Sequence, residues 1–186
     1  MKNILSAIKF TVVCIILFAV IYPLIISAVA HLTPYNGKGN TLEVNGKIVG
    51  FQNVGQSFTD TKYFWGRPSA VNYNAAGSGG SNKGPSNPEY LKDVQARIDS
   101  FLVYHPYLKK RQIPSEMVTA SGSGLDPDIS PLSAMIQVKR VARKRNISED
   151  KIIDLVNKQT QTPLFGLFGP PKVNVLELNI ALDNLK

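Results

Sequence analysis

The stretch Phe10–Ala30, FTVVCIILFAVIYPLIISAVA, decides how this chain is organised. Its 21 residues carry no charge. As a helix rising about 1.5 Å per residue they can cross a hydrocarbon core of about 30 Å. A single segment in lipid must satisfy its own backbone hydrogen bonds, so a helix is the expected structure, and Pro23 is expected to kink it. The sequence therefore predicts a transmembrane helix over residues 10–30.

The charges before this run predict its orientation. Lys2 and Lys9 precede it without an acidic residue nearby, and the positive-inside rule then places residues 1–9 in the cytoplasm and residues 31–186 outside. A cleaved secretory signal is the alternative, because Ala28-Val29-Ala30 fits the small-residue pattern of a cleavage site. The run is longer than the 7–15 apolar residues of most signal sequences, which favours a retained, single-pass anchor in the plasma membrane.

Composition limits what the outer part can be. The one cysteine, Cys14, lies inside the apolar run, so the outer part contains no cysteine and cannot form a disulfide. After residue 30 there are 19 lysines and arginines against 13 acidic residues, a net charge of about +6. Such a balance favours an anionic ligand, anionic lipid or an acidic partner, and outside a membrane nucleic acid is not expected.

The outer part reads as a single mixed α/β domain, so the predicted fold class is α+β behind one transmembrane helix. After a polar tether, Thr33–Asn40, the residues Asn45-Gly46 between Thr41–Val44 and Lys47–Gly50 predict a β-hairpin with a type I′ turn. Asn87-Pro88 and Ser130-Pro131 each predict an N-cap followed by a helix. The first of these helices should end before Pro106. Further helices are expected at Glu149–Lys158 and after Asn174, and a short strand is expected at Ile113–Thr119.

Residues 55–88 combine glycine, serine, asparagine and proline with several aromatic rings, which indicates an ordered but irregular loop. Two readings stay open: the rings cap the core, or they form a partner interface, where exposed aromatics and arginine concentrate binding energy. On the second reading Arg67 is expected to matter for assembly while its loss leaves the domain's melting temperature nearly unchanged. The interface candidates are Tyr63, Phe64, Trp65, Arg67, Ser78, Gly79, Gly80, Ser81 and Asn82.

A second small-residue stretch, Ala120–Pro127, could present backbone N–H groups to an anion through Ser121, Gly122, Ser123 and Gly124. It lacks the Gly-Lys-Ser/Thr ending of a P-loop, so a tight connection is the favoured interpretation. Five cations between Lys139 and Arg145 are read as a solvated helix face that attracts anions.

Catalytic chemistry is not expected. His31 and His105 stand in no metal-ligand spacing, and no nucleophile with a plausible base can be assembled. Asp126 and Asp128 could bind a cation weakly, although helix capping is the simpler role for residues of this kind. The sequence therefore predicts neither a catalytic site nor a metal site.

Several motifs together resemble the KdpC family, a subunit of the bacterial high-affinity potassium-transporting P-type ATPase. They are Gly55–Phe58, Tyr63–Ala70, Ser78–Pro88, Val118–Pro127, Ile129–Pro131 and Val173–Asn179, and the resemblance covers nearly the whole chain. Asp128 and Pro170 stand where the family often has His and Glu.

The resemblance implies an accessory subunit of an ATP-driven K⁺ uptake complex. Its partners would be a channel-like K⁺-translocating subunit, a P-type ATP-hydrolysing subunit and a small fourth membrane peptide. K⁺ is then the substrate of the complex, and the family's role as a catalytic chaperone implies ATP and nucleotide binding. Direct ATP contact conflicts with the predicted topology, because ATP is cytoplasmic. The alternative function is a membrane-anchored extracytoplasmic binding or scaffold protein for an anionic ligand or partner.

Overall fold

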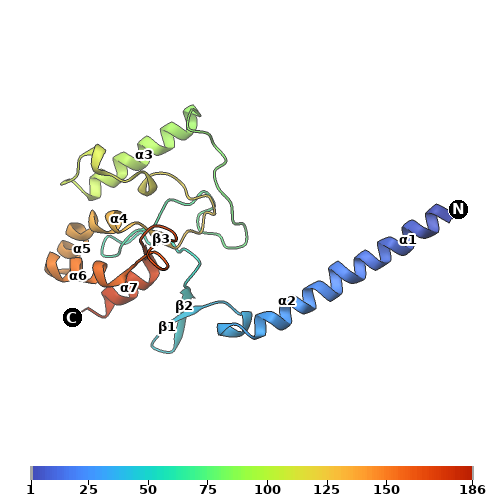
Figure 1. Ribbon diagram of the computed structural model, residues 1–186. Helices are drawn as coiled ribbons and strands as arrows, with labels where there is room; N and C mark the ends of the chain where they lie inside the picture. The colour runs from blue at the N-terminus through green and yellow to red at the C-terminus, as the bar shows by residue number, and fades with distance from the viewer. Residues whose placement is uncertain (1, 186) are drawn as a thin grey trace. The chain divides into compact units, whose positions relative to one another are not determined.

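The computed structural model describes residues 2–185 and divides into two compact units, one ending at Asn40 and the other beginning at Thr41. The first unit is a long apolar helix followed by a turn, and the second contains both helices and strands (Figure 1). This arrangement confirms the predicted fold class: one N-terminal apolar helix, followed by a mixed α/β domain.

The apolar helix runs through α1 (Lys2–Ile15), a π-helical segment η1 (Ile16–Ile21) and α2 (Tyr22–His31). Within residues 2–185, the stretch Asn3–His31 is the one helix long and apolar enough to cross a membrane, and an 18-residue window within it has a mean hydropathy of 2.9. The wider π turn directly precedes Pro23. Because proline lacks an N–H and its ring opposes the carbonyl four residues earlier, the helix accommodates it by a local change of winding. A short 3-10 turn, η2 (Pro34–Gly37), follows.

The second unit begins with the predicted hairpin. Strand β1 (Thr41–Val44) pairs antiparallel with β2 (Lys47–Phe51), with a register shift between Leu42 and Glu43. Asn45 and Gly46 have φ of 53° and 72°, the two positive values that a type I′ turn requires. The hairpin prediction is confirmed.

A second, three-stranded antiparallel sheet has the order β3 (Asp128–Ile129), β5 (Lys172–Asn174), β4 (Thr160–Gln161). Figure 1 shows α4 (Pro131–Met135), α5 (Val138–Arg145), α6 (Glu149–Gln159) and α7 (Val175–Asp183) gathered near this sheet, with α3 (Pro88–Tyr104) set to one side. The core forms where these elements meet. Its fully buried side chains include Phe64, Ile129, Val141, Ile152, Val156, Val173, Leu178 and Leu182.

The predicted helix starts are confirmed by their caps. The side chains of Asn87, Ser130 and Asn174 accept hydrogen bonds from the N–H groups of Tyr90, Ser133 and Glu177. Each cap thus pairs one of the first-turn N–H groups that have no partner within the helix. The helix at Glu149 also forms where expected, although Ser148 makes no side-chain capping bond.

Three sequence predictions are wrong. Ile113–Thr119 is no strand but contains a 3-10 turn, η4 (Ser115–Met117), because the N–H groups of Met117 and Val118 donate to the carbonyls of Pro114 and Ser115, three residues back, and not to a neighbouring strand. The helix after Ser130 breaks at Ile136–Gln137 into α4 and α5. Its cations also do not all face solvent, since Arg140 is 4% exposed.

Candidate partner interface

Two buried amide side chains hold the irregular loop at Phe64 and Trp65. The Phe64 N–H donates to Asn179 Oδ1 at 2.8 Å, and Asn179 Nδ2 donates back to the Phe64 carbonyl at 3.0 Å. Gln137 pairs in the same way with the N–H and carbonyl of Trp65, at 2.9 and 3.1 Å. The amides thus replace a neighbouring strand, which explains how this backbone is ordered and buried without regular structure.

Arg140 adds a third attachment to the same loop. Its guanidinium donates to the carbonyls of Thr61 and Tyr63, and it lies 4.1 Å from the centre of the Trp65 ring. It also donates to Gln137 Oε1 at 2.7 Å. Burial lowers the pKa of Arg140 to about 10, still well above neutral, so the side chain remains charged.

The two glycine-rich stretches predicted as separate candidates lie against each other. Ser69 Oγ donates to the Gly124 carbonyl at 2.7 Å, and the Gly79 N–H and Ser78 Oγ both donate to the Ser123 carbonyl, at 2.8 and 2.9 Å. A Cβ on Gly124 would lie 2.5 Å from Val71 Cγ2, and φ at this residue is +70°. Close approach of the two loops therefore depends on glycine at this position. We call residues 67–82 and 121–126 together the bridged loops.

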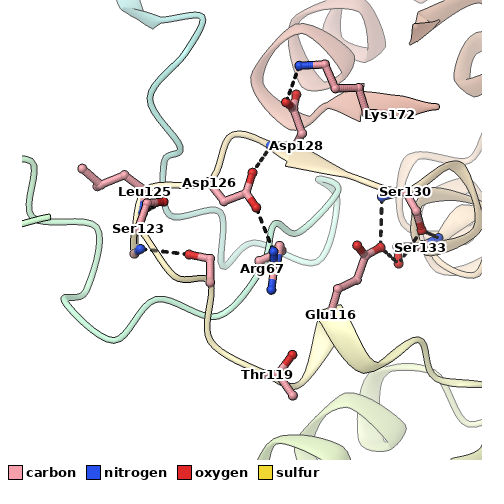
Figure 2. A network of polar contacts seen from close by, with 12 residues as sticks. Arg67, Glu116, Thr119, Ser123, Leu125, Asp126, Asp128, Ser130, Ser133 and Lys172 are labelled. Atoms are coloured by element: carbon pink, nitrogen blue, oxygen red, sulfur yellow. Dashed lines mark hydrogen bonds and ion pairs between the residues drawn. The ribbon is translucent and has the colours of Figure 1, made fainter. Parts of the chain in front are cut away.

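An ion pair joins the bridged loops at their base. Arg67 donates to Asp126 at 2.9 Å with both side chains about three-quarters buried, as Figure 2 shows. The other Asp126 oxygen accepts from the Asp128 N–H at 3.1 Å, and Asp128 pairs with Lys172 at 2.6 Å. These carboxylates serve ion pairs and a turn rather than a helix cap. The expectation that Arg67 contributes little to domain stability conflicts with this pairing.

The loop Ser121–Gly124 uses its own donors internally. Ser121 Oγ accepts from the Gly124 N–H at 3.0 Å, and Ser123 Oγ accepts from the Leu125 N–H at 3.1 Å. The Ser121 N–H donates to the Pro68 carbonyl. These three N–H groups are therefore not available to an anion, and the geometry agrees with the tight connection that the sequence favoured.

A carboxylate organises the start of α4 beside these loops. Glu116 accepts from the Ser130 N–H at 2.9 Å and from the Ser133 hydroxyl (Figure 2). Burial alone would raise the pKa of Glu116, but the hydrogen bonds from Ser130 and Ser133 outweigh it and lower the pKa below its usual value. Glu116 thus stays ionised and fixes η4 to α4.

A pocket of about 380 Å³ lies between the loop 57–73 and helix α3. Its lining combines aromatic rings with two arginines: Trp65, Arg67, Tyr73, Arg97, Phe101 and Tyr104. Arg97 donates to the Val118 carbonyl at 3.2 Å, while Arg67 Nε is buried without a hydrogen-bond partner. Burial, followed by the charge of Asp126, raises the pKa of Tyr73 to about 12, so its hydroxyl stays protonated.

The interface candidates divide by exposure. Phe64 is a fully buried core residue, whereas Tyr63, Trp65 and Arg67 are only partly buried, so part of each side chain is exposed at the surface. Ser78 and Asn82 are exposed, and Gly79, Gly80 and Ser81 lie half-buried between them. Sequence reasoning missed Gln137, Asn179 and Arg97, since polar residues on predicted helices carry no local signal for a partner about 20 to 115 residues away.

The cations of α5 separate into two sets. Arg140 faces the core, and Arg145 pairs with Asp183 at 2.6 Å and donates to the Lys62 carbonyl. Lys139, Arg143 and Lys144 are exposed. Within residues 2–185 the structure holds no group of three or more metal-ligating side chains.

The chain matches the family described as KdpC, the K⁺-transporting ATPase c chain, over residues 4–184. A potassium-transporting ATPase KdpC subunit of Flavobacterium johnsoniae is 61% identical, with both chains fully covered. One from Bacteroides fragilis is 53% identical over 100% of this chain and 99% of the relative, and one from Caldanaerobacter subterraneus is 46% identical over 97% and 94%.

Proposed function

The chain belongs to the KdpC family of K⁺-transporting ATPase subunits, and on this premise we propose that it is the accessory, non-catalytic subunit that stabilises the assembled complex. K⁺ is the substrate of that complex. The proposed partners are a channel-like K⁺-translocating subunit, a P-type ATP-hydrolysing subunit and a small fourth membrane peptide. The apolar helix packs in the membrane beside them, with the N-terminus cytoplasmic and the second unit outside.

We propose that any effect of this subunit on ATP affinity is indirect. The N–H groups of Ser121 and Gly124 bond within the bridged loops, so two of the four residues offered as an anion cradle have no donor to spare. Coupling between distant sites needs only a shared two-state element, which the assembled subunits can supply. Calorimetry on the purified full chain should then detect no ATP binding, while omission of the chain should raise the KM for ATP of the complex.

The bridged loops are our proposed docking surface on the outer face of the channel-like subunit, near the ion entrance. The observation that carries this proposal is the pair of bonds from Ser78 and Gly79 to the Ser123 carbonyl, which fix two exposed irregular loops in one arrangement. A surface held before binding loses little conformational entropy on association, so more of its contact energy appears as affinity.

Gly122 allows a direct test. It is exposed, and a Cβ added there would meet no atom within 4 Å, so Gly122→Glu should keep the wild-type melting temperature. At an interface the added charged side chain would be buried unpaired, and recovery of this chain with a tagged channel-like subunit should fall about tenfold or more. K⁺-stimulated ATPase activity should fall in parallel.

Asn157→Glu is the matched control, because Asn157 is exposed and lies on α6, which is not part of the bridged loops. This variant should assemble like wild type. A Gly122→Glu chain that assembles and supports ATPase activity as well as Asn157→Glu would remove the bridged loops from the interface, leaving the exposed cations Lys139, Arg143 and Lys144 as the next candidate surface.

A further inference from the structure

The turn between β4 and β5 carries an exposed apolar cluster that the proposed function does not use. Four of the five residues 164–168 are large and apolar. Leu164, Phe165, Leu167 and Phe168 are 63%, 83%, 81% and 65% exposed. Single exposed apolar residues are ordinary, but four adjacent ones at a loop tip indicate a surface that is covered in use. We call Pro163–Gly169 the apolar tip.

The apolar tip is a closed turn that bonds to itself. The Leu164 N–H donates to the Phe168 carbonyl at 3.1 Å, and the Phe168 N–H donates back to the Leu164 carbonyl at 3.0 Å. The N–H groups of Gly166 and Leu167 donate to the carbonyls of Pro163 and Leu164, at 2.8 and 3.1 Å. Pro163, Pro170 and Pro171 have no N–H to satisfy. Most backbone donors of this segment are therefore already paired or absent before it meets anything.

Charge is absent from the same segment. No charged side chain occurs between Lys158 and Lys172, so thirteen residues in succession are neutral. Lys158 lies in the last turn of α6 and Lys172 begins β5, at the base of the hairpin. Lys172 is paired with Asp128 at 2.6 Å, while the long side chain of the exposed Lys158 can keep its ammonium group in water beside an apolar phase.

We propose that the apolar tip inserts into the surface layer of the lipid bilayer, as a second membrane contact beside the apolar helix. A lipid phase offers no hydrogen-bond partners, so it accepts a protruding segment whose donors bond internally and which bears no charge. Lys158 matches the headgroup level, and the basic second unit is attracted to anionic lipid.

The tether permits this contact. Thr33–Asn40 is eight residues, four of them in the turn η2, and it reaches about 28 Å at most if that turn opens. A domain the size of the second unit has a radius of gyration of about 15 Å, which corresponds to a diameter of about 40 Å. A tether of this length therefore lets many faces of the unit, but not the face opposite Thr41, turn toward the bilayer from which it emerges.

The test uses the full chain reconstituted alone in vesicles of phosphatidylethanolamine and phosphatidylglycerol. Cys14→Ser removes the native thiol, and Pro170→Cys places an environment-sensitive fluorophore beside the tip without replacing any of its apolar residues. The emission should be shifted to the blue, quenched by lipids carrying a nitroxide near the headgroup, and protected from aqueous iodide.

A variant of the apolar tip tests whether its apolar side chains, and not the shape of the turn, cause insertion. Phe165 has φ +53°, which asparagine tolerates better than phenylalanine, so Phe165→Asn with Leu167→Gln should keep the turn while removing two apolar side chains. Iodide quenching should then rise severalfold and nitroxide quenching should be lost. Val103→Gln, at a 74% exposed apolar residue on α3, should leave both unchanged.

Two results would overturn the proposal. One is a wild-type tip that iodide quenches as strongly as the tip variant. The other is protection from iodide that arises only when the remaining subunits are reconstituted too, without nitroxide quenching, since that result assigns the tip to a protein groove. Because the first measurement contains this chain alone, its outcome does not depend on whether the bridged loops dock.

Discussion

Arg140 donates from Nε to Nε2 of His105 at 2.9 Å, so a buried arginine is paired with a neutral histidine and not with a carboxylate. The opposite ring nitrogen, Nδ1, lies 2.8 Å from the Phe101 carbonyl, which requires Nδ1 to carry the proton. The pair therefore assigns one tautomer to His105 and connects α3 to α5 and, through Arg140, to the loop at Thr61–Trp65.

This pair predicts acid sensitivity. Burial lowers the pKa of His105 to about 4, and the charge of Arg140 acts in the same direction. The hydrogen bond to the Phe101 carbonyl opposes this shift without cancelling it. As the pH falls from about 6.5 to about 4, the unfolded chain takes up a proton that the folded chain refuses, so stability falls by roughly 3 kcal/mol. Below about pH 4 this residue contributes no further loss. Urea unfolding of the full chain at pH 7.5 and 4.5 measures the change.

His105→Gln is the control for that prediction, because glutamine does not titrate while its amide can still accept from Arg140. The variant should be less stable at neutral pH and lose less stability on acidification than wild type. Equal losses in the two proteins would assign the acid sensitivity to carboxylates such as Glu116, whose lowered pKa acts in the same direction.

Gly124 and Gly122 predict opposite outcomes for the same substitution. Gly124→Ala introduces a Cβ 2.7 Å from the Gly79 carbonyl oxygen at a residue with φ +70°, so unfolding free energy should drop by about 2 kcal/mol or more. Gly122→Ala meets open space and should change it by less than about 0.5 kcal/mol. Denaturant midpoints of the two variants measure the difference. Equal losses of unfolding free energy at the two positions would show that the bridged loops separate without loss of stability.

Arg67 and Asp126 should be coupled. Their 2.9 Å ion pair is largely shielded from solvent, so a double-mutant cycle with Arg67→Gln and Asp126→Asn should give a coupling energy of about 1–2 kcal/mol in unfolding. Asp126→Asn should be the milder single change, because asparagine can still accept from the Asp128 N–H. Additive single effects, with no coupling, would show that the pair contributes nothing to the fold.

Topology can be tested at Ser115. This exposed residue of η4 can be replaced by cysteine in a Cys14→Ser background, leaving one accessible thiol. With Lys2 and Lys9 holding the N-terminus in the cytoplasm, an impermeant thiol reagent should label intact cells. Labelling that requires permeabilised cells would reverse the orientation and restore direct access of the second unit to ATP.

The sequence by itself determined the features that depend on neighbours in the chain. The apolar run needs only its length and lack of charge, the hairpin needs Asn45-Gly46, and the helix starts need a capping side chain three residues before the donor. The family motifs are likewise contiguous stretches, and the match over residues 4–184 agrees with them.

Only the tertiary structure decided which polar residues meet across long separations. Asn179 binds the backbone of Phe64, Arg140 enters the core beside His105, and Asp126 forms an ion pair with Arg67. The local sequence around Asn179, Arg140 and Asp126 does not predict these contacts. A buried polar group without a hydrogen-bond partner destabilises the fold, so such groups are paired. Which partner each one finds depends on how whole helices and loops pack together. Periodicity along the chain contains no information about that choice, which is why the core role of Arg140 and the joining of the two glycine-rich loops became visible only in three dimensions.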